Sequence, residues 1–158
     1  MKRTLFLILI AFGFLFLNTS FNILLPHPLK ADLVLTYILL LQAIEEKPLL
    51  IYALAFSFGL LNDAFTGMPA GLGALGYTTA VLVQRTTAKK LFPFSNLAAY
   101  LAVLVGSLAY SVFVPVGFLI KTGEFPYVYI FTIPLANFLA SFLILRYVKD
   151  VFIPPKTI

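Results

Sequence analysis

The chain has no cysteine, no tryptophan, only one histidine and few charged side chains. Without cysteine it can form neither disulfides nor thiolate metal sites, and the lone His27 cannot make a metal cluster. Charged residues make up 11% of its 158 residues, against about 25% in a soluble domain. So few charges could not cover the surface of a water-soluble fold of this length, and an ordinary soluble domain is therefore excluded.

Apolar sequence is what the chain has in abundance, since 61% of its residues are hydrophobic. A helix needs about 20 apolar residues to cross a bilayer core of ~30 Å. Six apolar stretches come near or above this length, with short polar breaks between them. We therefore predict an all-α, polytopic membrane bundle that forms a single integral membrane domain over residues 1–158. Its six transmembrane helices are expected at about 4–25, 29–44, 48–66, 70–84, 96–120 and 126–147.

Prolines and charged residues set the breaks between these stretches. The first ends at 26–28, where two prolines flank His27, and the second ends at the charged residues 45–47. Pro48 suits the first turn of the third helix. The first stretch, with Lys2 and Arg3 before it, also resembles a signal peptide. It lacks a cleavage site with small residues, so we favour an uncleaved spanning helix.

The basic residues predict the orientation of the bundle. With six spans and a cytoplasmic N-terminus, nine of the eleven lysines and arginines fall in inner segments, and only Lys30 and Lys121 fall outside. Basic residues collect on the cytoplasmic side of membrane proteins. Both termini are therefore expected in the cytoplasm. The same bias explains the net charge of +5. Nucleic-acid binding is not indicated, because the sequence has no basic face interleaved with aromatic residues.

The most informative segment joins the third and fourth stretches. Gly59, Asp63 and Gly67 recur every four residues, so they share one helix face, and two glycines would let another backbone approach beside the carboxylate. Asp63 lies about 22 Å along a helix that begins at Pro48, near its outer end. Two interpretations stay open: a buried hinge whose polar side chains bond loop amides or a partner, or a solvated turn. The residues of this hinge motif are Gly59, Asn62, Asp63, Gly67, Pro69 and Gly71.

This segment resembles the signature of the rod shape-determining protein MreD family. That family has a glycine, an aspartate four residues later, then glycine, proline and glycine before another apolar helix. The run 31–35, with Asp32, is similar to the acidic start of the family's second helix, and the likeness extends over about 31–90. One departure is Gly73, where the family often has a histidine or an asparagine.

The resemblance implies a fold, a location and partners. Members of the family sit in the bacterial cytoplasmic (inner) membrane, bind the MreC scaffold of the cell-elongation machinery, and help to position peptidoglycan synthesis. Their fold resembles the six-helix substrate-binding subunits of vitamin-uptake transporters. On this basis we expect a non-catalytic, multi-pass membrane protein that helps to maintain rod shape. Its expected partners are an MreC-type scaffold, other cell-elongation proteins and the lipid bilayer.

The residues themselves favour a role without catalysis or cofactor. They include no Ser-His-Asp set, no phosphate-binding glycine loop and no loop long enough for a catalytic domain. The alternative is a substrate-binding subunit of an energy-coupling factor type vitamin transporter, because short helices interrupted by Gly and Pro can mark a substrate site. Few polar residues and no alanine pattern in the first helix weigh against it. A channel would need a polar helix face, which no stretch has.

Several residues within the stretches indicate helix packing. Asn137 and Ser141 are four apart on one face, and we interpret them as interhelical hydrogen-bonding groups in preference to ligand contacts. Pro115 and Pro134 are expected to kink their helices.

The orientation can be tested with reporter fusions. Tags at the N-terminus, at Lys89 and at the C-terminus should all report a cytoplasmic position, because most basic residues lie on that side. A periplasmic signal from any of the three would contradict the six-span arrangement.

Overall fold

A computed structural model describes residues 2–24, 30–44, 47–91 and 96–152. Within these ranges the chain is all-helical and has no strand, which confirms the all-α class. The helices are α1 (Lys2–Leu24), α2 (Leu33–Ile44), α3 (Pro48–Thr66), α4 (Leu72–Leu91), α5 (Asn96–Ser111), α6 (Phe113–Thr122) and α7 (Tyr129–Phe152). His27 and the expected breaks at 26–28 and 45–46 lie outside the described residues.

The fifth apolar stretch, expected as one helix over 96–120, is two helices that meet at Val112. Val112 keeps right-handed helical angles, so the chain bends there without reversing. The cause is Pro115, which has no N–H to donate to the carbonyl of Ser111 four residues earlier. The hydroxyl of Ser111 donates to the carbonyl oxygens of Leu108 and Ile130. Pro134, by contrast, lies within the continuous helix α7.

Other boundaries differ from the predicted spans for reasons that the sequence explains. Helix α4 was expected to end near 84, but it continues to Leu91, and α7 continues past 147 to Phe152. Charged residues such as Arg85 limit the length of an apolar stretch, but they do not stop a helix. Helix α2 begins at Leu33 and not at 29, because Asp32 caps it: its carboxylate accepts a hydrogen bond from the N–H of Leu35 at 3.0 Å.

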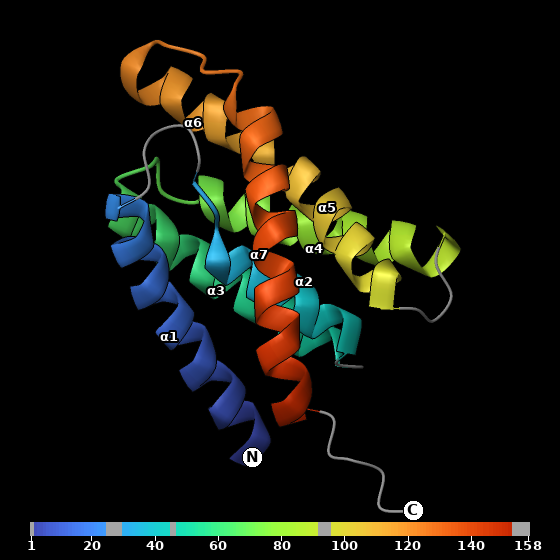
Figure 1. Cartoon of the computed structure of the whole chain (residues 1–158). Helices are drawn as coiled ribbons and strands as arrows, with labels where there is room; N and C mark the ends of the chain where they lie inside the picture. Colours follow the sequence, from blue (N-terminus) through green and yellow to red (C-terminus); the bar gives the residue numbers. More distant parts are fainter. Residues whose placement is uncertain (1, 25–29, 45–46, 92–95, 153–158) are drawn as a thin grey trace, which may run out of the picture.

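Helix α2 is the centre of the bundle, in contact with α1, α3, α4, α5 and α7. Every residue from 34 to 41 is buried, as expected of a helix that is apolar all round. Its 12 residues span about 18 Å, well short of the ~30 Å of a bilayer core. The N-terminal end of this helix therefore lies inside the protein, among the neighbouring helices (Figure 1).

Small residues let α4 and α5 pack closely beside α2. A Cβ atom on Gly106 would lie 2.9 Å from a methyl carbon of Leu39 and 3.3 Å from the carbonyl oxygen of Ala80. Gly76 likewise faces the ring of Tyr110, 2.8 Å from the position that its Cβ would take. These contacts join the three helices that carry most of the core.

The outer sides of the bundle are apolar. Large hydrophobic side chains such as Leu9 and Phe16 on α1, and Phe131, Leu139 and Leu143 on α7, are more than half exposed. Two segments of the described chain, Pro48–Thr66 and the α5–α6 pair over Ala98–Thr122, are long and apolar enough to cross a membrane. The fold is thus compatible with a membrane location.

The ends of the helices fall on two sides of the bundle. The start of α1 and the end of α7 lie together at one end (Figure 1). At the opposite end α1 and α3 finish, α2, α4 and α7 begin, and α6 follows α5. We call this second end, which carries the turn between α3 and α4, the turn end.

Candidate site at the turn end

The chain reverses between α3 and α4 through two glycines with left-handed backbones. Gly67 has φ of 64° and ends α3 by donating its N–H to the carbonyl oxygen of Asp63, which also accepts from Met68 at 3.1 Å. Gly71 has φ of 92° and precedes α4. Side chains other than glycine rarely adopt such angles. Pro69 lies between them and accepts a hydrogen bond from the N–H of Leu72. Gly67 and Gly71 of the motif thus serve the turn itself.

Asp63 closes the turn with its carboxylate. It lies on α3, is 3% exposed, and accepts hydrogen bonds from the N–H groups of Gly71 at 2.9 Å and Gly73 at 2.8 Å. These amides stand at the start of α4, where no carbonyl of that helix can reach them. A carboxylate there also meets the positive end of the helix dipole. Asp63 is therefore a buried cap for the following helix, which matches the buried-hinge interpretation and not the solvated turn.

Gly59 and Gly73 allow the two helices to touch at this point. A Cβ atom on Gly59 would lie 2.5 Å from Cα of Ala74, and one on Gly73 would collide with the Asp63 carboxylate and lie 2.8 Å from the carbonyl oxygen of Gly59. Gly73 is the position where the sequence departs from the MreD pattern. At this position the backbone N–H of Gly73 donates to the Asp63 carboxylate.

A second buried carboxylate, Asp32, organises the start of the central helix. Asp32 is 7% exposed, its carboxylate accepts a hydrogen bond from the hydroxyl group of Tyr77 on α4 at 2.6 Å, and Tyr110 on α5 lies against Tyr77. The two tyrosine rings meet edge to face, with centroids 5.3 Å apart. The carboxylate also bonds the N–H of Leu35, as a cap of its own helix. A helix that begins 40 residues after Asp32 is thus tied to the start of α2.

Two more amides at the start of α2 are paired with side chains of other helices. The N–H of Asp32 donates to Oδ1 of Asn137 on α7 at 2.7 Å, and the N–H of Leu33 donates to Oδ1 of Asn18 on α1 at 3.1 Å. Asn137 in turn donates to the hydroxyl of Ser107 on α5. The interhelical role predicted for Asn137 is confirmed, whereas Ser141 bonds the carbonyl of Phe138 in its own helix.

Sequence reasoning missed the cluster around Asp32, although it noted the residue. Asp32 was visible as a lone acid beside an apolar run, which in a membrane segment points to a buried partner. The other residues of the cluster, however, come from α1, α4, α5 and α7, and no spacing in the sequence relates them. Only the packing of the helices brings these groups together.

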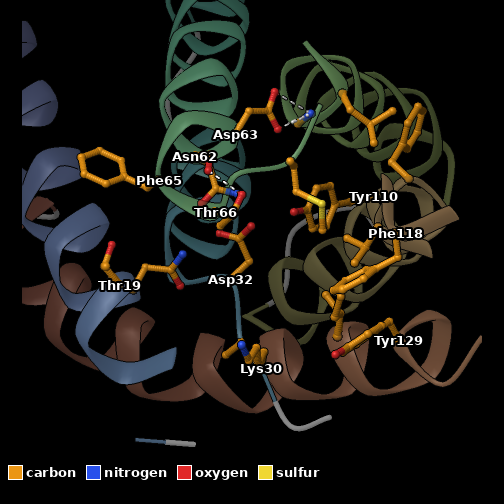
Figure 2. A pocket seen from close by; sticks show the side chains of 18 residues that line it. Thr19, Lys30, Asp32, Asn62, Asp63, Phe65, Thr66, Tyr110, Phe118 and Tyr129 are labelled. Carbon is orange, nitrogen blue, oxygen red and sulfur yellow. Dashed lines mark hydrogen bonds between the residues drawn. The ribbon is translucent and has the colours of Figure 1, made fainter. Parts of the chain in front are cut away.

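A cavity of about 340 Å³ lies at the turn end, bordered by the residues before α2 and by the start of α4, and is partly open to the surface (Figure 2). Apolar and aromatic side chains from α4, α5, α6 and α7 form much of its wall. Its polar lining residues are Asn18, Thr19, Lys30, Asp32, Asn62, Asp63, Thr66, Tyr110 and Tyr129.

The motif residues divide between the turn and this cavity. Asn62 and Asp63 line the cavity, while Gly59 faces α4 and Gly67, Pro69 and Gly71 shape the turn. The described residues include no group of three or more His, Cys, Asp or Glu side chains placed to hold a metal ion.

Comparison of the chain with family models, with curated proteins and with solved structures finds no match.

Replacing Asp63 tests its role as a cap. Asp63→Leu leaves the amides of Gly71 and Gly73 without their acceptor, so we expect it to lower the free energy of unfolding by at least about 2 kcal/mol. Asp63→Asn keeps one acceptor oxygen and should cost about 1 kcal/mol. Unfolding of the purified protein in a mixed-detergent titration measures both.

The neighbouring, exposed Ala64 provides the control. Ala64→Leu adds the same side chain one position along α3 and should leave the unfolding transition unchanged. Equal losses from the Leu variants at 63 and 64 would contradict the capping role.

Proposed function

We propose that this chain is a non-catalytic, multi-pass protein of the bacterial cytoplasmic membrane that takes part in cell elongation, by holding an MreC-type scaffold and so helping to position peptidoglycan synthesis. The observation that carries the proposal is the turn between α3 and α4. Gly59, Asp63, Gly67 and Gly71, which bear the resemblance to the MreD family, each have a definite geometric task there. Because one compact turn explains the spacing of the motif, the turn supports an architecture shared with the MreD family better than the sequence pattern alone does.

The proposed membrane arrangement has six spans, with α5 and α6 together forming the fifth. An even number of spans is supported by the start of α1 and the end of α7, which lie at the same end of the bundle (Figure 1). The basic residues favour the cytoplasm for that end. The turn end would then face outward. Helix α2 would be the short central span, shielded from lipid by its neighbours.

The outer sides of the bundle suit a holding role. A protein whose exposed faces are apolar on α1 and α7 can offer a partner in the membrane a broad helical surface. The turn end offers an edge on the outer side, rigid because α3 and α4 are joined by the Asp63 cap. A periplasmic scaffold with its own membrane helix could bind both surfaces at once.

The cavity favours a second candidate, the substrate-binding subunit of a vitamin-uptake transporter. The sequence argument against it was the small number of polar residues. The fold gathers polar side chains from α1, α3, α5 and α7 around one space, so that objection loses force. The missing alanine pattern in the first helix still separates this chain from uptake subunits that dock an energising partner, and we rank this function second.

Depletion of the protein from a rod-shaped host distinguishes the two functions. We expect depleted cells to become round, and no vitamin supplement to restore their shape. Wild-type protein and Ala64→Leu should restore rods, whereas Asp63→Leu should fail, because the outer edge loses its cap. Cell width by microscopy, with membrane levels of each variant by immunoblot, gives the result.

Cells that stay rod-shaped but stop accumulating a labelled vitamin would reject the elongation proposal in favour of uptake. Co-purification in mild detergent adds an independent check: a coiled-coil periplasmic scaffold should accompany the wild-type protein.

A further inference from the structure

Asn62 is a polar group at the turn end that the capping of the helices does not use. It is 7% exposed and lines the cavity, and within the described residues its side-chain amide makes no hydrogen bond. The backbone carbonyl of Asn62 accepts from Thr66, a bond that does not involve the amide. The amide borders the cavity without a protein partner, so its donor and its acceptor are open to a ligand there.

The two carboxylates beside Asn62 are already occupied. Asp63 accepts from backbone amides of the α3–α4 turn, and Asp32 accepts from Tyr77 and from its own helix. Neither therefore requires a cation to satisfy it. With Lys30, the charged lining residues carry a formal charge of minus one, which disfavours an anion. The neutral carboxamide of Asn62, with one donor group beside one acceptor, remains free for hydrogen bonding, together with the Lys30 ammonium group.

The rest of the wall defines the body of the ligand. Phe113, Val114 and Phe118 on α6 and Ile133 on α7 face the cavity. Phe118 stacks on Tyr129 with centroids 5.4 Å apart and an angle of 12° between the rings, which gives the wall a flat aromatic part. The volume of about 340 Å³ falls at the lower end of the range for small-molecule sites, about 300–1,000 Å³.

We propose that this cavity binds a small neutral molecule with a flat apolar body and an amide-like edge, which pairs its own donor and acceptor with the side chain of Asn62. The site is separate from the scaffold role, since it concerns binding by the purified chain alone. Failure of this proposal would leave the cell-shape proposal untouched, and the reverse also holds.

The absence of cysteine makes a thiol-protection experiment direct. Val114→Cys places a single thiol, with little change of volume, on the wall of the cavity. Its rate of reaction with N-ethylmaleimide is measured on the purified full-length chain in mild detergent. The probes are benzamide, benzoate and benzamidine, which share a ring and a planar head but are neutral, anionic and cationic.

We expect benzamide to slow the labelling of the Val114→Cys protein about threefold at twice its dissociation constant, with benzoate and benzamidine much weaker. Adding Asn62→Leu to the Val114→Cys chain should weaken the affinity for benzamide about tenfold, through loss of the paired hydrogen bonds. Thr122→Cys, exposed and outside the cavity, should label equally fast with and without the probes.

Three results would overturn the proposal: protection by none of the probes, better protection by a charged probe than by benzamide, or full protection by benzamide in the Asn62→Leu chain. Met68→Cys, also in the cavity wall, repeats the test should Val114→Cys fail to fold. Asn62→Ala replaces Asn62→Leu should that variant fail to fold. Circular dichroism establishes the fold of each variant.

Discussion

The start of helix α2 lies inside the protein, and the rest of the bundle is arranged to make that possible. A helix start carries N–H groups that no carbonyl of the same helix can reach, and leaving one buried without a partner costs about 1–3 kcal/mol. Within an apolar bundle no water replaces the missing partner. Asn137, Asn18 and the Asp32 carboxylate supply acceptors for three of these groups. The carboxylate is held in turn by the hydroxyl of Tyr77, whose ring packs against Tyr110.

This constraint ties distant parts of the chain to one point. Helices α1, α4 and α7 each contribute a side chain to the start of α2, so each has its rotation about its own axis restricted. Dispersion and apolar packing hold membrane helices together but choose rotation and register weakly. The hydrogen bonds of a polar cluster can all form in only one arrangement of the helices. The cluster therefore selects that arrangement among many that pack equally well. The apolar residues 34–41 then fill the centre around it.

The Asp63 cap repeats the same solution at the start of α4. In both places one carboxylate accepts several hydrogen bonds, and in both the helix dipole favours the negative charge. Residues at the starts of both helices, Asp32 and Leu72, line the cavity at the turn end. Asn62, which directly precedes the capping residue Asp63, lines it too.

The sequence predicted the parts of this fold that depend on local chemistry. Apolar runs identified the helical class, Pro48 marked the start of α3, and the Gly59–Asp63–Gly67 spacing located the turn. It could not predict the cluster around Asp32, because Asp32 and Tyr77 are 45 residues apart and are brought together only by helix packing. The sequence predicted a kink at Pro115, but it could not predict that the helix would divide in two at Val112. The cavity was hidden for the same reason, since its walls come from elements spread over the whole chain.

A double-mutant cycle between Asp32 and Tyr77 tests the central role of the polar cluster most directly. The free energy of unfolding in mixed detergent is measured for Asp32→Asn, Tyr77→Phe and the double variant. A control cycle combines Asp32→Asn with Tyr52→Phe, since Tyr52 lies near the start of α3, away from the turn end. The account predicts a coupling energy of about 1–3 kcal/mol between Asp32 and Tyr77, and additive effects, within about 0.5 kcal/mol, for Asp32 and Tyr52. Additive effects for Asp32 and Tyr77 would contradict it, because the hydroxyl of Tyr77 would then contribute nothing to holding the Asp32 carboxylate.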